Sequence, residues 1–230
     1  MKECFFMSQS RNQNWLNART MVTLAMLTAV AWVVTYLCKA IPSVIGFLDF
    51  EFKSVVICIG GFTLGPAAAV IMSILEPVVE FFTYSGTGPY GLIMNIAATA
   101  SFCCPACYIY KRRHTMNGAV AGLAVGTVTL TVVMVLWNYL ITPLYQGTPR
   151  EVIAGMLLPV FLPFNLTKGG LNMAATLLLY KPVVTALRRA GLVPPSTGGQ
   201  SRKFSGGFVL FALALLITFV LFALVLLGII

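Results

Sequence analysis

The sequence predicts an all-α, polytopic membrane protein, and two features of its composition lead to that fold class. Of the 230 residues, 59% are hydrophobic and only 9% are charged, whereas about 25% of the residues in soluble domains are charged. The apolar residues form long runs that do not alternate with a period of two, which favours helices over the strands of a membrane barrel. We therefore expect one compact helical membrane domain.

Six apolar segments separated by turn residues predict a six-helix bundle. A spanning helix needs about 20 apolar residues, and the candidate segments cover residues 20–38, 53–64, 67–82, 90–110, 119–141 and 164–187. The first is followed by a break at Pro42, the second is short and ends at Gly65, and Pro89 is placed to open the fourth. Residues 151–162 are apolar but are interrupted by Pro159 and followed by Pro163, so we expect a short, partly re-entrant piece there.

The two ends of the chain differ from this core. Residues 1–19 are polar and mixed, and we interpret them as a cytoplasmic N-terminal segment without a cleaved signal peptide. The six-helix membrane domain is expected to cover residues 20–190. A Pro/Gly/Ser-rich linker follows at residues 191–207, and residues 208–230 are expected to form an additional, seventh transmembrane helix.

The distribution of Lys and Arg predicts the orientation in the cell membrane. With the N-terminus in the cytoplasm, 11 of the 15 basic residues face the cytoplasm, and only Lys39, Lys53, Arg150 and Lys168 do not. The net charge of +9 therefore indicates contact with an anionic lipid bilayer rather than with nucleic acid.

Polar residues within the sixth segment form the first candidate site. Asn165, Lys168 and Asn172 are three and four residues apart, which places them on one stripe of a helix. Gly169 and Gly170 would allow another backbone or a flat ligand to approach closely. The alternative is a structural role in which Lys168 pairs with a carboxylate from another helix.

Three further polar positions can contribute to the same site. Asn138 lies between two aromatic residues near the outer end of the fifth segment, and Tyr145 follows it; an interfacial aromatic belt is the competing interpretation. Asn95 can join the cavity or make an interhelical hydrogen bond. Glu76 and Glu80 can pair with Lys39, Lys53 or Lys168, but we favour a water-exposed helix end for them.

The sequence gives little support for catalysis or for a metal site. It has no P-loop and no HExxH motif, and its single histidine, His114, lies in a basic loop. Of six cysteines, Cys104 and Cys107 have the spacing of a redox or zinc motif, but they lie in an apolar run without a second ligand pair, which favours packing. We therefore predict no enzyme activity, no catalytic residues and no bound metal.

Several motifs together resemble a known family. They are residues 163–169 (Pro-Phe-Asn-Leu-Thr-Lys-Gly), residues 60–66 (Gly-Gly-Phe-Thr-Leu-Gly-Pro), residues 88–91 with Asn95, and Asn138 with Tyr145. In these motifs the chain resembles the substrate-binding S components of energy-coupling factor (ECF) transporters, and most closely the riboflavin-specific ones. The resemblance covers roughly residues 20–189.

The resemblance implies a function, a site and partners. Such proteins have six helices, bind a vitamin in an outward-facing cavity, and dock on a transmembrane coupling subunit that two ATPase subunits drive. Carried over, the flavin contacts are Asn138, Asn165 and Lys168, with riboflavin as the transported ligand and no cofactor. Ala25 and Ala29 resemble the family's docking surface, and small residues at this spacing let helices approach closely.

The apolar run 208–230 and the pair Glu76 and Glu80 depart from the riboflavin-specific pattern. Three alternatives stay open: an S component for another vitamin or a flavin analogue, a membrane-embedded enzyme acting on a lipid, and a carrier that works without partners.

Overall fold

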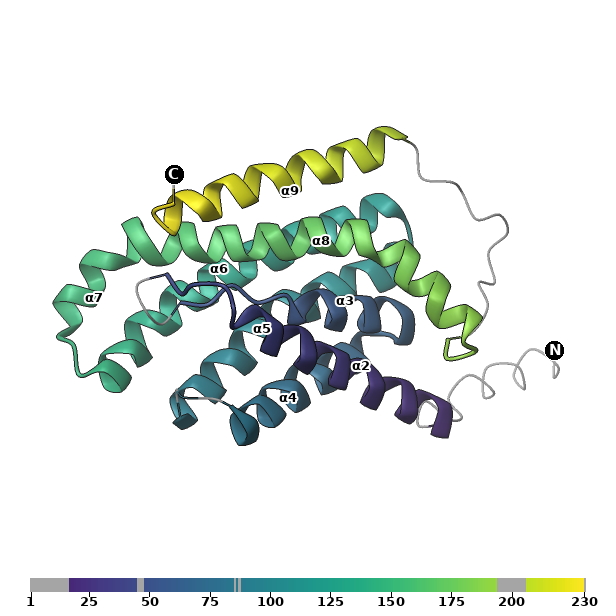
Figure 1. The fold of residues 1–230 in the computed structure, drawn as a ribbon, viewed down its shortest axis with the longest axis horizontal. Coiled ribbons are helices and arrows are strands. Elements are labelled where there is room, and N and C mark those ends of the chain that lie inside the picture. Colours follow the sequence, from purple (N-terminus) through teal and green to yellow (C-terminus); the bar gives the residue numbers. More distant parts are fainter. Residues whose placement is uncertain (1–16, 45–47, 85, 87, 194–205, 230) are drawn as a thin grey trace, which may run out of the picture.

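The computed structural model describes residues 17–44, 48–84, 86, 88–193 and 206–229 (Figure 1). These residues fold into helices, and the one β pairing among them is an isolated bridge between Val44 and Leu48. The predicted all-α class is confirmed. The elements in chain order are α2 (Ala18–Cys38), α3 (Lys53–Leu64), α4 (Pro66–Thr83), α5 (Gly88–Arg113), α6 (Met116–Gln146), α7 (Arg150–Met156), the π-helical turn η2 (Leu157–Phe161), α8 (Leu162–Arg189) and α9 (Gly206–Leu226).

Six of the helical stretches in the described part of the chain are long and apolar enough to cross a membrane, and α3 is the short exception. Its 12 residues span only about 18 Å at 1.5 Å per residue. Most of its side chains are buried, so α3 is surrounded by protein rather than by lipid. A short helix that begins with a charged residue, Lys53, is therefore tolerated at this position. The short second segment predicted from the sequence is confirmed.

Residues 151–162 do not form the re-entrant piece that we predicted. Instead α7, η2 and α8 follow one another directly in one helical stretch of 40 residues, Arg150–Arg189. Pro159 lies in the π-helical turn and Pro163 in the first turn of α8. A π-turn and a helix start both tolerate a missing backbone N–H, which explains why these prolines do not end the helix.

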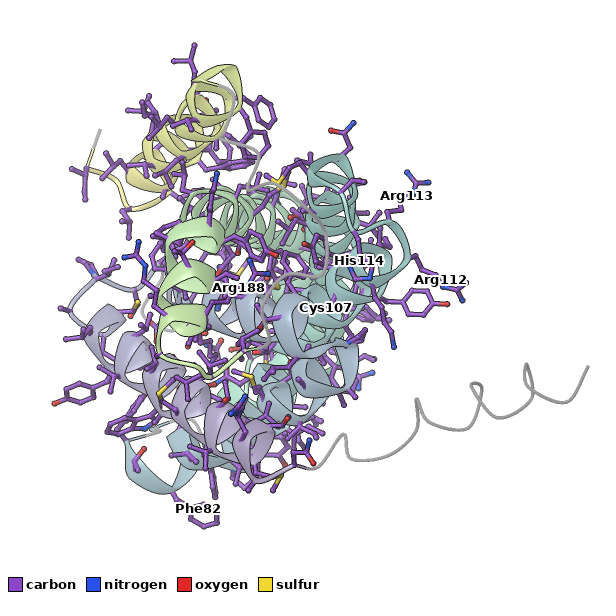
Figure 2. All side chains as sticks on the ribbon, turned by 90° about the vertical axis from the view of Figure 1, so that its right-hand side faces the viewer. Phe82, Cys107, Arg112, Arg113, His114 and Arg188 are labelled. Atoms are coloured by element: carbon purple, nitrogen blue, oxygen red, sulfur yellow. The ribbon has the colours of Figure 1, made fainter. Side chains whose placement is uncertain are left out.

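The helices alternate in direction. The start of α2, the end of α8 and the start of α9 therefore lie at the same end of the molecule (right in Figure 1), which we call the basic end because Arg19, Arg188 and Arg189 lie in these helix ends. Helix α9 packs along α8, whereas α2 and α4 lie on the opposite side of the bundle (Figure 1). Seen from the basic end in Figure 2, α9 covers only one side of the bundle. Arg112 and Arg113 lie at the right of this view and Arg188 lies near its middle. Only 11% of the apolar stretch of α9 is buried, so most of this helix is available to lipid.

Helices α5 and α6 pack closely because α6 carries glycines where the backbones cross. A Cβ atom added to Gly126 would lie 2.5 Å from the carbonyl oxygen of Phe102, and one added to Gly122 would lie 2.7 Å from that of Ala106. Small residues four apart are a common means of close helix packing in membranes. Neither glycine can be enlarged without separating the two helices.

One ion cluster holds α3, α4 and the segment before α3 together. The Lys53 ammonium lies 2.6 Å from Glu80, 3.3 Å from Glu76 and 3.5 Å from Glu51, and all four side chains are almost fully buried. Thr35 on α2 donates a hydrogen bond of 3.0 Å to Glu76, which adds a fourth element. The water-exposed helix end that we favoured for Glu76 and Glu80 is therefore wrong, and the alternative pairing with Lys53 is confirmed. Buried charges require such partners because an isolated buried charge is strongly unfavourable.

We predict that Gly126→Val lowers the stability of the folded protein by about 1–3 kcal/mol, the usual cost of overpacking. The measurement is thermal unfolding of the full chain in detergent. Gly155→Val is the matched control, because Gly155 is also helical and has no atom within 4 Å of its added Cβ. Equal destabilisation by both substitutions would contradict the close packing of α5 and α6.

We predict that Lys53→Met destabilises the protein by about 3–5 kcal/mol, because it leaves the buried carboxylates of Glu76 and Glu80 without their counter-charge, while Glu51 keeps only Lys168. Lys39→Met is the control: Lys39 pairs with Asp49 at 2.6 Å, but these side chains are 40% and 25% exposed, and an exposed pair contributes about 0–1 kcal/mol. If both variants unfold at the same temperature in detergent, the Lys53 cluster does not have the structural role described above.

Candidate functional site

A cavity opens among the helices at the end of the molecule opposite the basic residues. Its volume is about 110 Å³. The polar side chains that line it come from the segment before α3 and from α4, α5, α6 and α8; they are Lys39, Asp49, Glu51, Glu80, Asn95, Asn138, Asn165 and Lys168. Apolar side chains complete the walls: Leu48, Met94, Ala98, Met134 and Phe164.

Four of the predicted site residues meet in this cavity, although three different helices supply them. They are Asn95 on α5, Asn138 on α6, and Asn165 and Lys168 on α8. Asn172 does not line it. Instead its side-chain nitrogen donates to the backbone oxygens of Glu51 and Lys168, each at 2.9 Å, and so it fixes the segment before α3 against α8. The side chain of Tyr145 lies outside the described residues.

Lys168 is held by the segment before α3. Its ammonium lies 3.0 Å from the Glu51 carboxylate, donates to the backbone oxygen of Asp49 at 3.1 Å, and lies 5.9 Å from the centre of the Phe164 ring. Burial by itself would raise the pKa of Glu51, but the ammonium groups of Lys168 and Lys53 outweigh it and lower this pKa to about 2. Glu51 is thus ionised at neutral pH. It is the carboxylate partner that we considered as the structural alternative for Lys168. Lys168 nevertheless lines the cavity.

The two buried asparagines are oriented by their own helices. The side-chain nitrogen of Asn165 donates to the backbone oxygen of Phe161 at 2.7 Å, and that of Asn138 donates to Met134 at 2.7 Å. Thr142 donates to the side-chain oxygen of Asn138 at 3.0 Å. An amide nitrogen has two N–H donors, so each of these bonds leaves one donor for a ligand. The bonds therefore fix the orientation of both amide groups and leave one N–H donor of each without a bond to its own helix.

Glu80 connects the cavity to the Lys53 cluster. Its carboxylate accepts a hydrogen bond of 3.2 Å from Asn95 and one of 2.6 Å from Lys53, and it lines the cavity. Our sequence reasoning did not place Asp49, Glu51 or Glu80 in the site. In the sequence, Asp49 and Glu51 alternate with Leu48 and Phe50 next to a membrane segment, and this amphipathic pattern is the signal that could have identified these two acids.

The remaining predicted residues lie away from the cavity. Ala25 and Ala29 are exposed on the face of α2 that points away from the bundle, among other exposed apolar side chains. Cys103 and Cys107 are buried and their thiols face the backbone oxygens of Ser54 and Cys58 at 3.6 and 3.8 Å, so they pack α5 against α3. No group of three metal-ligating side chains gathers among the described residues.

A family model and the sequences of known proteins both match this chain. Residues 19–180 match the family model described as ECF transporter, substrate-specific component. The riboflavin transporter RibU of Staphylococcus aureus is 28% identical over 189 residues, covering 80% of this chain and all of RibU. The riboflavin transporter FmnP of Bacillus subtilis is 26% identical over 168 residues, covering 67% of this chain and 86% of FmnP.

The fold agrees with these sequence matches. A solved structure described as the S component of a bacterial ECF transporter superposes with a TM-score of 0.63 and 29% sequence identity, and the match covers 74% of this chain and 98% of that one. The family model ends at residue 180, so it does not include α9. Because the match covers most of the helical bundle and its cavity, the chain belongs to the family of substrate-specific components of ECF transporters.

Proposed function

We propose that this chain is the riboflavin-binding S component of an ECF transporter, and that the cavity described above is its binding site. One observation carries the proposal: Asn138, Asn165 and Lys168 converge on a single cavity from two helices. The relatives named above support riboflavin as the ligand, since both are riboflavin transporters.

The chemistry of the cavity walls matches the two parts of riboflavin. The pyrimidine edge of the flavin ring presents one N–H donor between two carbonyl acceptors, and asparagine supplies both a donor and an acceptor, whereas lysine supplies donors only. The carboxylates of Asp49, Glu51 and Glu80 on the cavity wall can accept hydrogen bonds from the hydroxyl groups of the ribityl chain. Met94, Met134 and Phe164 provide apolar contacts for the ring faces.

The cavity is too small to hold riboflavin in its present shape. Its volume of about 110 Å³ is smaller than the roughly 300–1,000 Å³ typical of sites for ligands of this size. Riboflavin must therefore widen the cavity as it enters. In this proposal the non-helical segment before α3 moves outward, which breaks its contacts to Lys168 and Asn172 on α8.

The proposed orientation follows from charge. We place the N-terminus and the basic end in the cytoplasm, so that the cavity opens outside the cell. Residues 20–190 form the vitamin-binding domain and 208–230 a seventh transmembrane helix in this proposal. The exposed face of α2 with Ala25 and Ala29 docks on the transmembrane coupling subunit of the ATPase module. The chain itself has no enzymatic role and uses no cofactor.

We predict that Asn165→Ala and Lys168→Ala each weaken riboflavin binding by about 1–3 kcal/mol, the cost of leaving a buried polar group unpaired. Quenching of riboflavin fluorescence by the purified full chain measures the affinity. Asn117→Ala and Lys111→Ala are matched controls, because both residues are exposed at the opposite end of the molecule. Unchanged affinity in both cavity variants would exclude this cavity as the binding site.

We predict that Ala25→Trp combined with Ala29→Trp stops riboflavin uptake by cells that contain the ATPase module, while riboflavin binding by the purified variant is unchanged. Bulky side chains at these positions would hold the coupling subunit away from α2. Ala214→Trp is the control, because Ala214 is an exposed alanine on α9, on the other side of the bundle. Normal uptake by the double variant would place the docking surface elsewhere.

A further inference from the structure

The wall of the proposed vitamin cavity carries more acidic than basic side chains. Its acidic residues are Asp49, Glu51 and Glu80, and its basic residues are Lys39 and Lys168. Three formal negative charges therefore face two positive ones. This balance bears on which flavin the cavity accepts, because natural flavins differ in charge at the end of the ribityl chain.

Both basic residues of the wall are paired with carboxylates. The ammonium of Lys39 lies 2.6 Å from Asp49, and that of Lys168 lies 3.0 Å from Glu51. Among the described residues that line the cavity, each cation thus has a carboxylate partner. An anionic group that enters the cavity meets cations whose charge is already neutralised.

The cation behind the wall is also paired. Lys53 lies 2.6 Å from Glu80, but it is shared with Glu76 at 3.3 Å and with Glu51 at 3.5 Å. The charge of this one ammonium is divided among three acidic side chains, and Lys53 does not line the cavity. It therefore offers no binding group to an anionic ligand.

Paired carboxylates accept hydrogen bonds from hydroxyl groups but repel phosphate. A carboxylate has about four acceptor positions, so Asp49 and Glu80 can bind ribityl hydroxyl groups while they keep their ammonium partners. A phosphate monoester carries about −1.5 to −2 charges at pH 7 and presents acceptor oxygens. Placing it against carboxylates is strongly unfavourable, because like charges repel and the phosphate oxygens lack donors.

The end of the ribityl chain lies at the Lys39–Asp49 pair if the asparagines hold the ring. Asn138 and Asn165 are buried, whereas the side chains of Lys39 and Asp49 are 40% and 25% exposed. A flavin ring at the two asparagines therefore directs its ribityl chain towards the more open side of the cavity. The terminal hydroxyl of this chain is the group that carries the phosphate in flavin mononucleotide (FMN).

We propose, on the basis of the function proposed above, that the Lys39–Asp49 pair makes the site selective for riboflavin over its phosphate ester, FMN. Asp49 neutralises Lys39 and so prevents it from serving as a phosphate-binding group. Asp49 is thus a specificity-determining residue that acts chiefly by rejecting the wrong ligand.

The test is a pair of titrations of the purified full chain at neutral pH, one with riboflavin and one with FMN, both followed by flavin fluorescence. We expect the wild-type chain to bind FMN at least about 100-fold more weakly than riboflavin. In D49N the new amide still accepts a hydroxyl hydrogen bond but leaves Lys39 without its counter-charge. The ratio of the two affinities should therefore fall at least about tenfold, the effect of one charge-assisted hydrogen bond to phosphate.

Two further variants separate local charge from net charge and from shape. E151Q removes the same charge from an exposed position outside the cavity, and it should keep the wild-type ratio. D49N/K39Q removes both members of the pair, so the rejection of FMN should return. These side chains are partly exposed, so all variants should unfold near the wild-type temperature.

The selectivity is overturned if the wild-type chain binds FMN as tightly as riboflavin, or if D49N keeps the wild-type ratio. It is also overturned if E151Q changes the ratio as much as D49N does, or if D49N/K39Q keeps the ratio of D49N. A folded wild-type chain that binds neither flavin overturns the proposed function as well, whereas equal binding of both flavins leaves that function standing.

Discussion

The burial of Lys53 among three carboxylates is the interaction on which the rest of the structure depends. Its ammonium lies within 3.5 Å of Glu51, Glu76 and Glu80. Each of these groups would be strongly unfavourable alone at this depth, and each is acceptable only because the others are present. The cluster therefore fixes the start of α3, the end of α4 and the segment that precedes α3 in one relative arrangement.

The same cluster extends to both proposed functional surfaces. Glu51 holds Lys168 on the cavity wall, and Glu80 holds Asn95 there. On the other side, Glu76 accepts a hydrogen bond from Thr35 on α2, whose outer face is the proposed docking surface. One continuous set of buried polar contacts thus connects the cavity wall to α2.

The helices could be predicted from the sequence because each signal was local, and the four polar residues that the structure brings to the cavity were recognisable for the same reason. Asn165 and Lys168 are three residues apart in one apolar segment, and Asn138 stands out against its apolar neighbours. The pairing of Glu76 and Glu80 with Lys53 was one of the alternatives, but the sequence could not favour it, because Lys53 is more than 20 residues away and only tertiary packing brings it within reach. The continuous helix through Pro159 was missed for another reason: proline is tolerated in a π-turn, and no sequence pattern marked one there.

The most direct test of the account is a riboflavin titration of the purified wild-type chain, followed by the fluorescence of the ligand. The account predicts that riboflavin fluorescence is quenched until one equivalent has been added to each protein molecule, with a sharp end point. A folded protein that leaves the fluorescence unchanged at all ratios would contradict it, and would assign the cavity to a different ligand.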